Sequence, residues 1–180
     1  EGVDPEGELL LKGGHQNNRP SSMHPELRMV ENIFEELDSE REWYFDKQTN
    51  RLYLWGEEGT DLSNSITEIS RLKHLIEISG NREKPVNNVK IEGIRFAHTK
   101  TTFMEDYDKL LRSDWTIYRG GAILLGGTDS IVISDCEFSD LGGNVIFVNG
   151  YNRNTEIVGN HIHDCGGTAI AFVGDPTSVR

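Results

Sequence analysis

The sequence repeats one phrase at a fixed interval. "FSDLGGNVIFV" (Phe138 to Val148) returns as "IHDCGGTAIAF" (Ile162 to Phe172), with each matched position 24 residues later. A second pattern, "NNVKIEGIRF" (Asn87 to Phe96), returns as "DSIVISDCEF" (Asp129 to Phe138) and as "NTEIVGNHI" (Asn154 to Ile162). A unit of this size cannot bury its apolar side alone, so it must stack on copies of itself.

The composition of the unit indicates how the copies stack. Each copy contains short strands rich in β-branched residues, separated by bends and a pair of glycines. This predicts a parallel β-helix, in which each coil adds one rung to three parallel sheets. About three coils align through Ile91, Ile133 and Ile157, through Phe96, Phe138 and Ile162, and through the glycine pairs 120/121, 142/143 and 166/167. Leucine-rich repeats and a β-sandwich are minor alternatives, since the first need Leu at fixed positions with a helical return and the second does not explain a constant offset.

The chain before the repeats follows other patterns, which predict an N-terminal region over 1–65 and the β-helix over 66–180. From Pro25 to Leu37 the apolar residues fall at helical spacing, which predicts a short amphipathic helix. "EWYFDKQTNRLYLW" (Glu42 to Trp55) surrounds a turn-forming centre with alternating aromatic runs, which predicts a β-hairpin.

Three further features concern the organisation of the chain. Short strand-like pieces are expected from Ile66 to Ile78, and the first coil carries an insertion at about 98–120. The chain begins with Glu1 and ends with Arg180, so we expect it to be an internal segment of a longer protein.

Charge and hydropathy argue against two kinds of partner. With 18 basic and 30 acidic side chains the net charge is −12, which repels a phosphate backbone and argues against nucleic acid. The apolar runs, such as Ala169 to Val173, are far shorter than the roughly 20 residues of a membrane span. Cys136 and Cys165 occupy different slots of the repeat, so we expect free thiols. The oligomeric state stays open.

Several stretches carry a resemblance to a known family. They are "VENIFEELDSEREWYFDKQTNRLYLW", "LIEISGNREKPVNNVKIEGIRF", "LLRSDWTIYRGGAILLGG" and the two later coils. From about Met29 onward the chain resembles right-handed parallel β-helix proteins of the pectin-lyase-like superfamily, and more narrowly bacterial glycoside hydrolases related to α-L-fucosidases and xylanases. The resemblance implies an all-β, right-handed β-helix, a carbohydrate-active enzyme, and an extracellular or periplasmic location. One such scaffold also supports lyases, esterases and non-catalytic proteins.

Equal slots in successive coils lie above one another at roughly 4.8 Å, so the alignment predicts columns of side chains. Three columns face outward: Arg95, Glu137 and His161; Ala97, Ser139 and His163; and His98, Asp140 and Asp164. Neighbouring carboxylates repel when both are ionised, so a protonated acid and a charged partner can coexist at neutral pH. Glycoside hydrolysis requires this pair. We therefore predict Asp140, Asp164 and His98 as catalytic residues, with the two aspartates as the acid/base and the nucleophile or base.

Other interpretations of these residues stay open. Asp before Gly is common in turns, where the carboxylate accepts backbone N–H bonds, and the pair can also bind calcium or substrate without catalysis. His161 and His163 share one outward face of a strand, and with Glu137 they are candidates for substrate contact. A metal role would need a third ligand that is not evident. Asn160, in the slot of Cys136, is expected to bond along the stack and close a bend.

The insertion supplies a second group of candidates. Its flat aromatic rings and charged groups suit the apolar face and the hydroxyls of a sugar. The candidates for substrate contact are Arg112, Asp114, Trp115, Tyr118 and Arg119. The insertion leaves the coil after His98, so we expect it beside the aspartate column. The alternative is that Trp115 and Ile117 pack on the β-helix as a lid without a ligand.

The leading hypothesis is a glycoside hydrolase that acts on a plant-type or bacterial polysaccharide without a cofactor. The first alternative is a polysaccharide lyase, in which acidic side chains hold Ca²⁺ that neutralises a uronate while a basic residue abstracts a proton. The second is a non-catalytic β-helix that binds glycans or forms a structural stalk.

Overall fold

The computed structural model describes residues 2–3, 5, 9–10, 31–103, 105, 108–109 and 116–175. The chain forms two compact units. One comprises residues 21–68, and the other comprises residues 1–20 and 69–180. Within the second unit, β1 (Gly2–Val3) pairs antiparallel with β2 (Leu9–Leu10). No helix in the described part of the chain is long and apolar enough to cross a membrane.

The unit of residues 21–68 contains the predicted hairpin. β3 (Trp43–Asp46) pairs antiparallel with β4 (Arg51–Leu54). Asp46 closes the turn between them, because its carboxylate accepts the Gln48 N–H at 2.8 Å and the Thr49 hydroxyl at 2.5 Å. These bonds, the Thr49 hydroxyl first, hold the pKa of Asp46 below its usual value. Asp46 thus stabilises the turn that joins the two aromatic strands.

The described part of the predicted amphipathic helix forms only a 3-10 turn, η1 (Phe34–Glu36). Asn32 adopts a left-handed φ of 58° and Ile33 is extended, so the helical path is broken before Phe34. The Asn32 side chain instead bonds the hairpin, accepting the Phe45 N–H at 2.9 Å and donating to the Phe45 carbonyl at 3.3 Å. Such side-chain bonding to the backbone competes with helix formation. Residues 25–30 lie outside the described residues.

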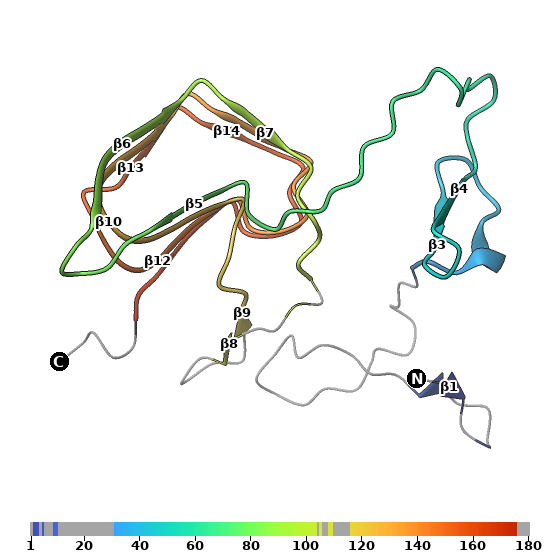
Figure 1. Cartoon of the computed structure of the whole chain (residues 1–180), viewed down its shortest axis with the longest axis horizontal. Coiled ribbons are helices and arrows are strands. Elements are labelled where there is room, and N and C mark those ends of the chain that lie inside the picture. Colours follow the sequence, from blue (N-terminus) through green and yellow to red (C-terminus); the bar gives the residue numbers. More distant parts are fainter. Residues whose placement is uncertain are drawn as a thin grey trace. The chain divides into compact units, whose positions relative to one another are not determined.

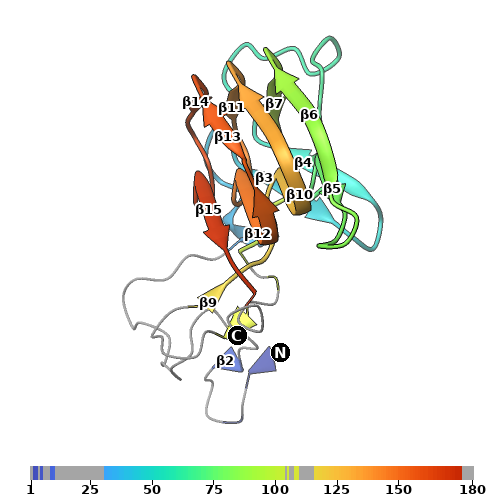
Figure 2. The same cartoon turned by 90° about the vertical axis from the view of Figure 1, so that its left-hand side faces the viewer.

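The second unit contains the predicted parallel β-helix. Its strands are β5 (Ile76–Ser79), β6 (Val86–Glu92), β7 (Arg95–Ala97), β10 (Ile123–Ser134), β11 (Glu137–Ser139), β12 (Ile146–Arg153), β13 (Glu156–Val158), β14 (His161–Ile162) and β15 (Ile170–Val173). Figure 1 looks down the axis of the β-helix, so that the three sides of its coils can be seen. Figure 2 shows the strands of successive coils stacked side by side.

All pairings between these strands are parallel. The first sheet joins β5, the start of β10, the start of β12 and β15. The second joins β6, the end of β10 and β13, and the third joins β7, β11 and β14. The described residues form three coils and the first strand of a fourth. Of the strand-like pieces expected between Ile66 and Ile78, only β5 forms. Ile66 is 91% exposed, and residues 66–75 belong to no strand in the structure.

The strand register confirms most of the sequence alignment. Ile133 lies opposite Ile91 and Ile157, and Phe138 lies opposite Phe96 and Ile162. Phe96 and Phe138 stack with ring centroids 5.0 Å apart. Full burial of such a side chain contributes roughly 1.5–3 kcal/mol. The inward positions of successive coils therefore make one continuous core.

The alignment of the glycine pairs needs a correction at the first coil. The backbone beside Gly142 is that of residues 99–102, since Thr99 Oγ1 accepts the Gly142 N–H at 2.9 Å and Thr102 N–H donates to the Gly142 carbonyl at 3.1 Å. A Cβ on Gly142 would lie 2.5 Å from the Thr101 nitrogen, so this close approach requires glycine. Residues 99–102 thus still belong to the coil, and the insertion begins after them.

Asn160 closes a bend of the coil as predicted. Its side chain accepts the Cys136 N–H at 2.9 Å and donates to the Ile133 carbonyl at 2.8 Å. It thereby bonds two backbone groups beside the corner between β10 and β11. Cys136 is buried and Cys165 is partly buried, and both are free thiols.

The described part of the insertion packs against the outer face of the first sheet. It contains the antiparallel pair β8 (Asp108–Lys109) and β9 (Thr116–Ile117). Ile117 packs with Phe147 and Ala171, and Phe147 is fully buried although it points away from the main core. The insertion therefore shields an apolar patch of the coil.

Candidate functional site

The outer face of the third sheet brings together four of the predicted site residues: Glu137, His161, His163 and Asp164. Register places Arg95, Glu137 and His161 side by side on β7, β11 and β14. Their neighbours Phe96, Phe138 and Ile162 belong to or pack on the core, and alternate residues of a strand face opposite sides. The three polar side chains therefore point outward. We call this surface the polar sheet face, with His163 and Asp164 included; Ser139 on the same side of β11 is fully buried.

Hydrogen bonds and ion pairs connect the residues of the polar sheet face. His163 Nδ1 lies 2.7 Å from Asp164 Oδ2, and His163 Nε2 lies 3.5 Å from Glu137 Oε1. Arg95 Nε lies 3.7 Å from the same Glu137 oxygen, and Arg95 Nη2 donates to Ser139 Oγ at 3.4 Å. The His161 ring lies 4.5 Å from the His163 ring, centroid to centroid. His163 is thus held between two carboxylates.

This environment raises the pKa of His163 above its usual value of 6.5. The hydrogen bond to Asp164 is the largest cause, the bond to Glu137 adds to it, and partial desolvation opposes both. Histidine titrates near neutral pH, so small shifts change its charge under ordinary conditions. The polar sheet face therefore contains an imidazole that bridges two acidic side chains, and these favour its protonated form.

The third predicted column has a shared backbone conformation. His98, Asp140 and Asp164 have φ values of 62°, 52° and 49°, all in the left-handed region. The His98 N–H donates to the Asp140 carbonyl at 3.1 Å, and a parallel bridge joins Leu141 to Cys165, so the three lie on neighbouring coils. Asn, Asp and His are the non-glycine residues that enter this region most often. Backbone geometry alone thus explains why such residues occupy the column.

The two aspartates use their side chains differently. Among the described residues neither carboxylate accepts a backbone N–H, so the expected turn capping is not formed there. Asp164 is bonded to His163, and its side chain is 74% exposed. Asp140 is exposed and bonds no side chain that the structure describes. Both carboxylates are therefore accessible to a ligand.

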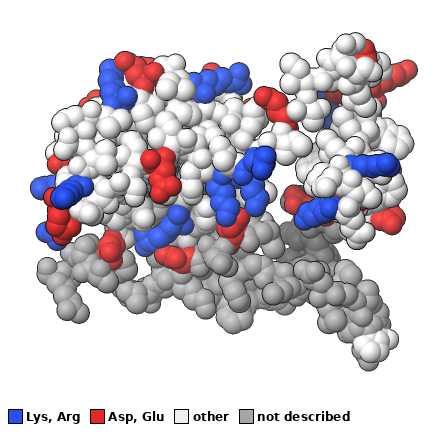
Figure 3. Space-filling view, in the orientation of Figure 1, with Lys and Arg blue, Asp and Glu red and all other residues white. Residues whose placement is uncertain are grey.

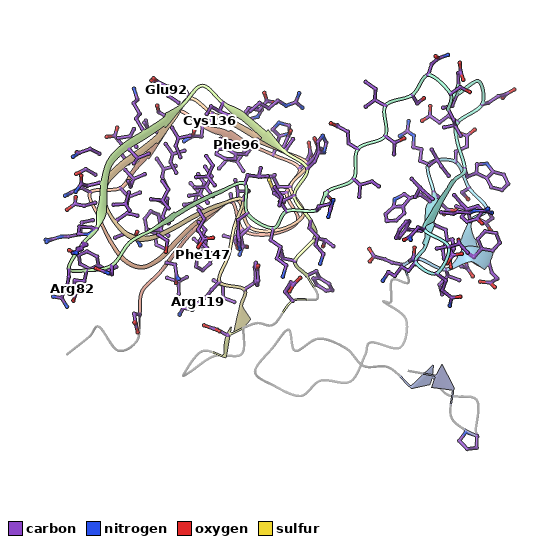
Figure 4. All side chains as sticks on the ribbon, in the orientation of Figure 1. Arg82, Glu92, Phe96, Arg119, Cys136 and Phe147 are labelled. Carbon is purple, nitrogen blue, oxygen red and sulfur yellow. The ribbon has the colours of Figure 1, made fainter. Side chains whose placement is uncertain are left out.

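The insertion does not bring Arg119 to this site. The Arg119 guanidinium donates to Asn149 Oδ1 on β12 at 2.7 Å and to the Gly174 carbonyl at 3.5 Å, and it also pairs with Asp108. Figure 4 shows Arg119 beside Phe147, on the opposite side of the coil from Phe96. Arg119 fixes the insertion to the first sheet, and the expectation that it lies beside the aspartate column is wrong.

The other insertion candidates are only partly described. Tyr118 is half-buried at the corner before β10, where its carbonyl accepts Asn144 Nδ2 at 3.1 Å. Arg112, Asp114 and Trp115 lie outside the described residues, so their predicted contact with substrate stays a prediction.

His98 borders a groove that sequence reasoning missed. Its walls are Ile69, Ser70, Arg71, Leu72, Leu75 and His98, and its volume is about 490 Å³. The sequence signal for this groove was the group of basic residues Arg71, Lys73 and His74 in an acidic chain. The signal was missed because the alternating apolar residues of the same stretch were interpreted as strands. Among the described residues no group of three or more His, Cys, Asp or Glu side chains is placed to hold a metal ion.

Comparison with known protein families finds a match that covers the coils. A family model described as "Right handed beta helix region" matches residues 74–179, more than half of the chain. None of the curated proteins or solved structures that were compared matches the chain. The matched residues run from just before β5 to beyond β15 and include every residue of the polar sheet face.

Proposed function

Because the chain belongs to the right-handed β-helix family, we propose that it is a carbohydrate-active enzyme that binds a glycan across the polar sheet face and hydrolyses a glycosidic bond there. A scaffold of this kind supports several activities, so the residues of the site decide which of them the chain can perform. The observation that supports the proposal is the connected set Arg95, Glu137, His163 and Asp164 on an outer sheet face, with Asp140 exposed on the coil next to Asp164.

A glycan fits the chemistry and the shape of this surface. Arg95 and the histidines are donors, whereas Glu137 and Asp164 are acceptors, so together they can match sugar hydroxyls in either role. The residues repeat across three adjacent strands rather than around a closed pocket. Such a row suits a chain of sugar residues that crosses the strands.

Hydrolysis requires one acid and one nucleophile or base on opposite sides of the scissile bond. In the proposal, Asp140 gives its proton to the leaving glycosidic oxygen as the bond from that oxygen to the anomeric carbon breaks. Asp164 either attacks the anomeric carbon or takes a proton from the water that attacks it. Water supplies the new hydroxyl in both cases. His163 positions Asp164 through the 2.7 Å bond, and His98 and His161 contact the sugar.

Substitution of each aspartate tests the proposal. Asp140→Asn and Asp164→Asn keep a residue that tolerates the left-handed backbone. Each should lower kcat/KM for release of reducing ends from a cleaved glycan by about 100-fold or more, because acid–base groups contribute roughly 10²–10⁴-fold. The matched control is Asp135→Asn, an exposed aspartate with φ of 52° at a different corner of the coil. It should keep wild-type activity.

The other outcomes separate the competing hypotheses. Unchanged activity in both variants would remove Asp140 and Asp164 from catalysis. Binding of glycans without cleavage of any member of a broad panel would favour a non-catalytic binding protein. Loss of activity in chelator, with a product that absorbs in the ultraviolet, would replace the hydrolase by a lyase.

A further inference from the structure

The groove beside His98 is held firmly on the first coil. Its segment, residues 69–75, is anchored where the Leu72 carbonyl accepts the Lys100 N–H at 2.9 Å and where the Leu75 N–H donates to the Ala122 carbonyl at 2.8 Å. His74 Nδ1 lies 2.8 Å from the Gly121 carbonyl oxygen. These bonds join the segment to the turn after β7 and to the start of β10. The wall formed by Leu72 and Leu75 is therefore anchored to the coil that contains His98.

The groove lies in a locally basic region. Lys73 Nζ lies 2.7 Å from Glu105 Oε2 and Lys100 Nζ lies 3.5 Å from Glu105 Oε1, so two ammonium groups share one carboxylate. These contacts, the Lys73 bond first, lower the pKa of Glu105. Arg71 on the groove wall is exposed and forms no ion pair with the residues that the structure describes. In Figure 3 blue side chains gather at the side of the β-helical unit where this segment enters it.

The net charge of the chain does not oppose an anion here. Residues 69–180 carry 12 basic and 14 acidic side chains, a net charge of −2, so most of the total of −12 comes from residues before Ile69. The basic side chains described at or near the groove are Arg71 on its wall and Lys73 and Lys100, which share Glu105.

The groove also adjoins the proposed catalytic column. His98 both lines the groove and donates its backbone N–H to the Asp140 carbonyl at 3.1 Å. Leu72 and Leu75 give the groove an apolar wall, whereas Arg71 and Ser70 give it hydrogen-bond donors. This combination matches a sugar ring, with one C–H face, that carries a negative group. Arginine suits such groups because its planar fork can bond two oxygens at once.

We propose that this groove is a subsite for an anionic sugar residue, with Arg71 paired to a carboxylate or sulfate and His98 beside the ring. The subsite deepens the proposed function and rests on it. A glycan that crosses the polar sheet face past Asp140 would place its next residue in the groove. The enzyme would then prefer acidic glycans to neutral ones of the same length.

Calorimetric titration of the 180-residue chain tests the preference. The probes are a uronic acid oligosaccharide, its carboxyl-reduced neutral counterpart, and a sulfated form of that neutral oligosaccharide. At least one anionic probe should bind about tenfold or more tightly than the neutral one, because hydrogen bonds to charged groups are the strong ones. The anionic probe that binds tightly identifies carboxylate or sulfate as the preferred group. A higher salt concentration should weaken the binding of that probe.

Two variants connect the preference to the groove. Arg71→Gln should reduce the anionic preference to about twofold or less while affinity for the neutral oligosaccharide is kept. Arg82→Gln is the control, since Arg82 is also exposed but lies over the Tyr151 ring, and it should keep the preference. Equal binding of anionic and neutral probes, or an unchanged preference in Arg71→Gln, would overturn the subsite. Binding and cleavage of the neutral oligosaccharide would then still support the proposed function, whereas absence of binding to all three probes would count against both.

Discussion

At the scale of single residues, the backbone conformation at the corners of the coil explains why Asp, Asn and His occur there. His98, Asp140 and Asp164 occupy left-handed positions, and Asn160 pairs backbone groups at another corner. The repeated aspartate therefore meets a conformational need before any chemistry is considered. A functional role depends on the contacts of the side chain, and the Asp164 carboxylate bonds His163.

Removing the Asn160 side chain should destabilise the β-helical unit. Asn160→Ala leaves the Cys136 N–H and the Ile133 carbonyl without their partner at a partly buried corner, which costs about 1–3 kcal/mol in free energy of unfolding. Urea denaturation measures the loss. Asn87→Ala, on the exposed part of β6, should change stability by less than about 0.5 kcal/mol. Equal effects of the two variants would contradict the role of Asn160.

The pKa of His163 gives a second test at this scale. The pKa is raised, so the pair with Asp164 stabilises the folded chain below pH 6.5, and this contribution is lost as pH rises through the raised pKa. NMR titration of the His163 ring should give a midpoint above 6.5, and Asp164→Asn should lower it, because Asp164 is the largest cause. A midpoint that does not respond to Asp164→Asn would show that the bond is absent in solution.

Sequence patterns predicted the columns at residue resolution but not the contacts between them. The constant offset fixes which residues share a slot, so Arg95, Glu137 and His161 could be placed side by side. The bond from His163 to Asp164 depends on rotamers at adjacent positions, which no spacing encodes. The groove at Arg71 was missed because it arises from two segments that are far apart in the chain.

At the scale of elements, the insertion and the hairpin region show where local patterns mislead. Apolar spacing predicted a helix through Leu37, yet Asn32 bonds the backbone of Phe45 and the described part of the segment forms only η1. Phe34 on η1 packs edge-on against Tyr44 and Tyr53 at centroid distances of 5.3 Å. The apolar residues thus serve a tertiary contact rather than a helix face.

Arg119 should stabilise the packing of the insertion without serving the glycan site. Arg119→Ala removes bonds to Asn149, Gly174 and Asp108, and its side chain is only 23% exposed, so the expected loss is about 1–3 kcal/mol. Hydrogen exchange should rise in β12 around Phe147. Arg153→Ala, an exposed arginine at the end of the same strand, is the control. A specific loss of glycan affinity in Arg119→Ala with unchanged stability would contradict this assignment.

At the scale of the whole molecule, each β-helical coil is stabilised by its neighbours. The middle coil is covered on both sides, so Ile133 is fully buried, whereas Ile157 on the next coil is only partly buried. The fold class followed from the period because a 24-residue unit of short strands has few other ways to bury its apolar side. The alignment of the repeats also predicted about three coils.

Core substitutions should therefore depend on coil position. Ile133→Ala should cost about 2–5 kcal/mol, in the range for buried Ile→Ala changes, and Ile157→Ala should cost distinctly less. Thermal and urea unfolding of both variants measure the difference. Equal losses would mean that the outer coils are packed as fully as the middle one.

The account predicts that a glycan crosses β7, β11 and β14 and the turns that contain His98, Asp140 and Asp164. The most direct measurement is hydrogen exchange of the Asp140→Asn variant with and without a glycan that the wild type cleaves. Bound glycan should protect residues 95–102, 137–143 and 161–167. Protection confined to the outer face of β6, β10 and β13, or to the hairpin of β3 and β4, would contradict the proposed site.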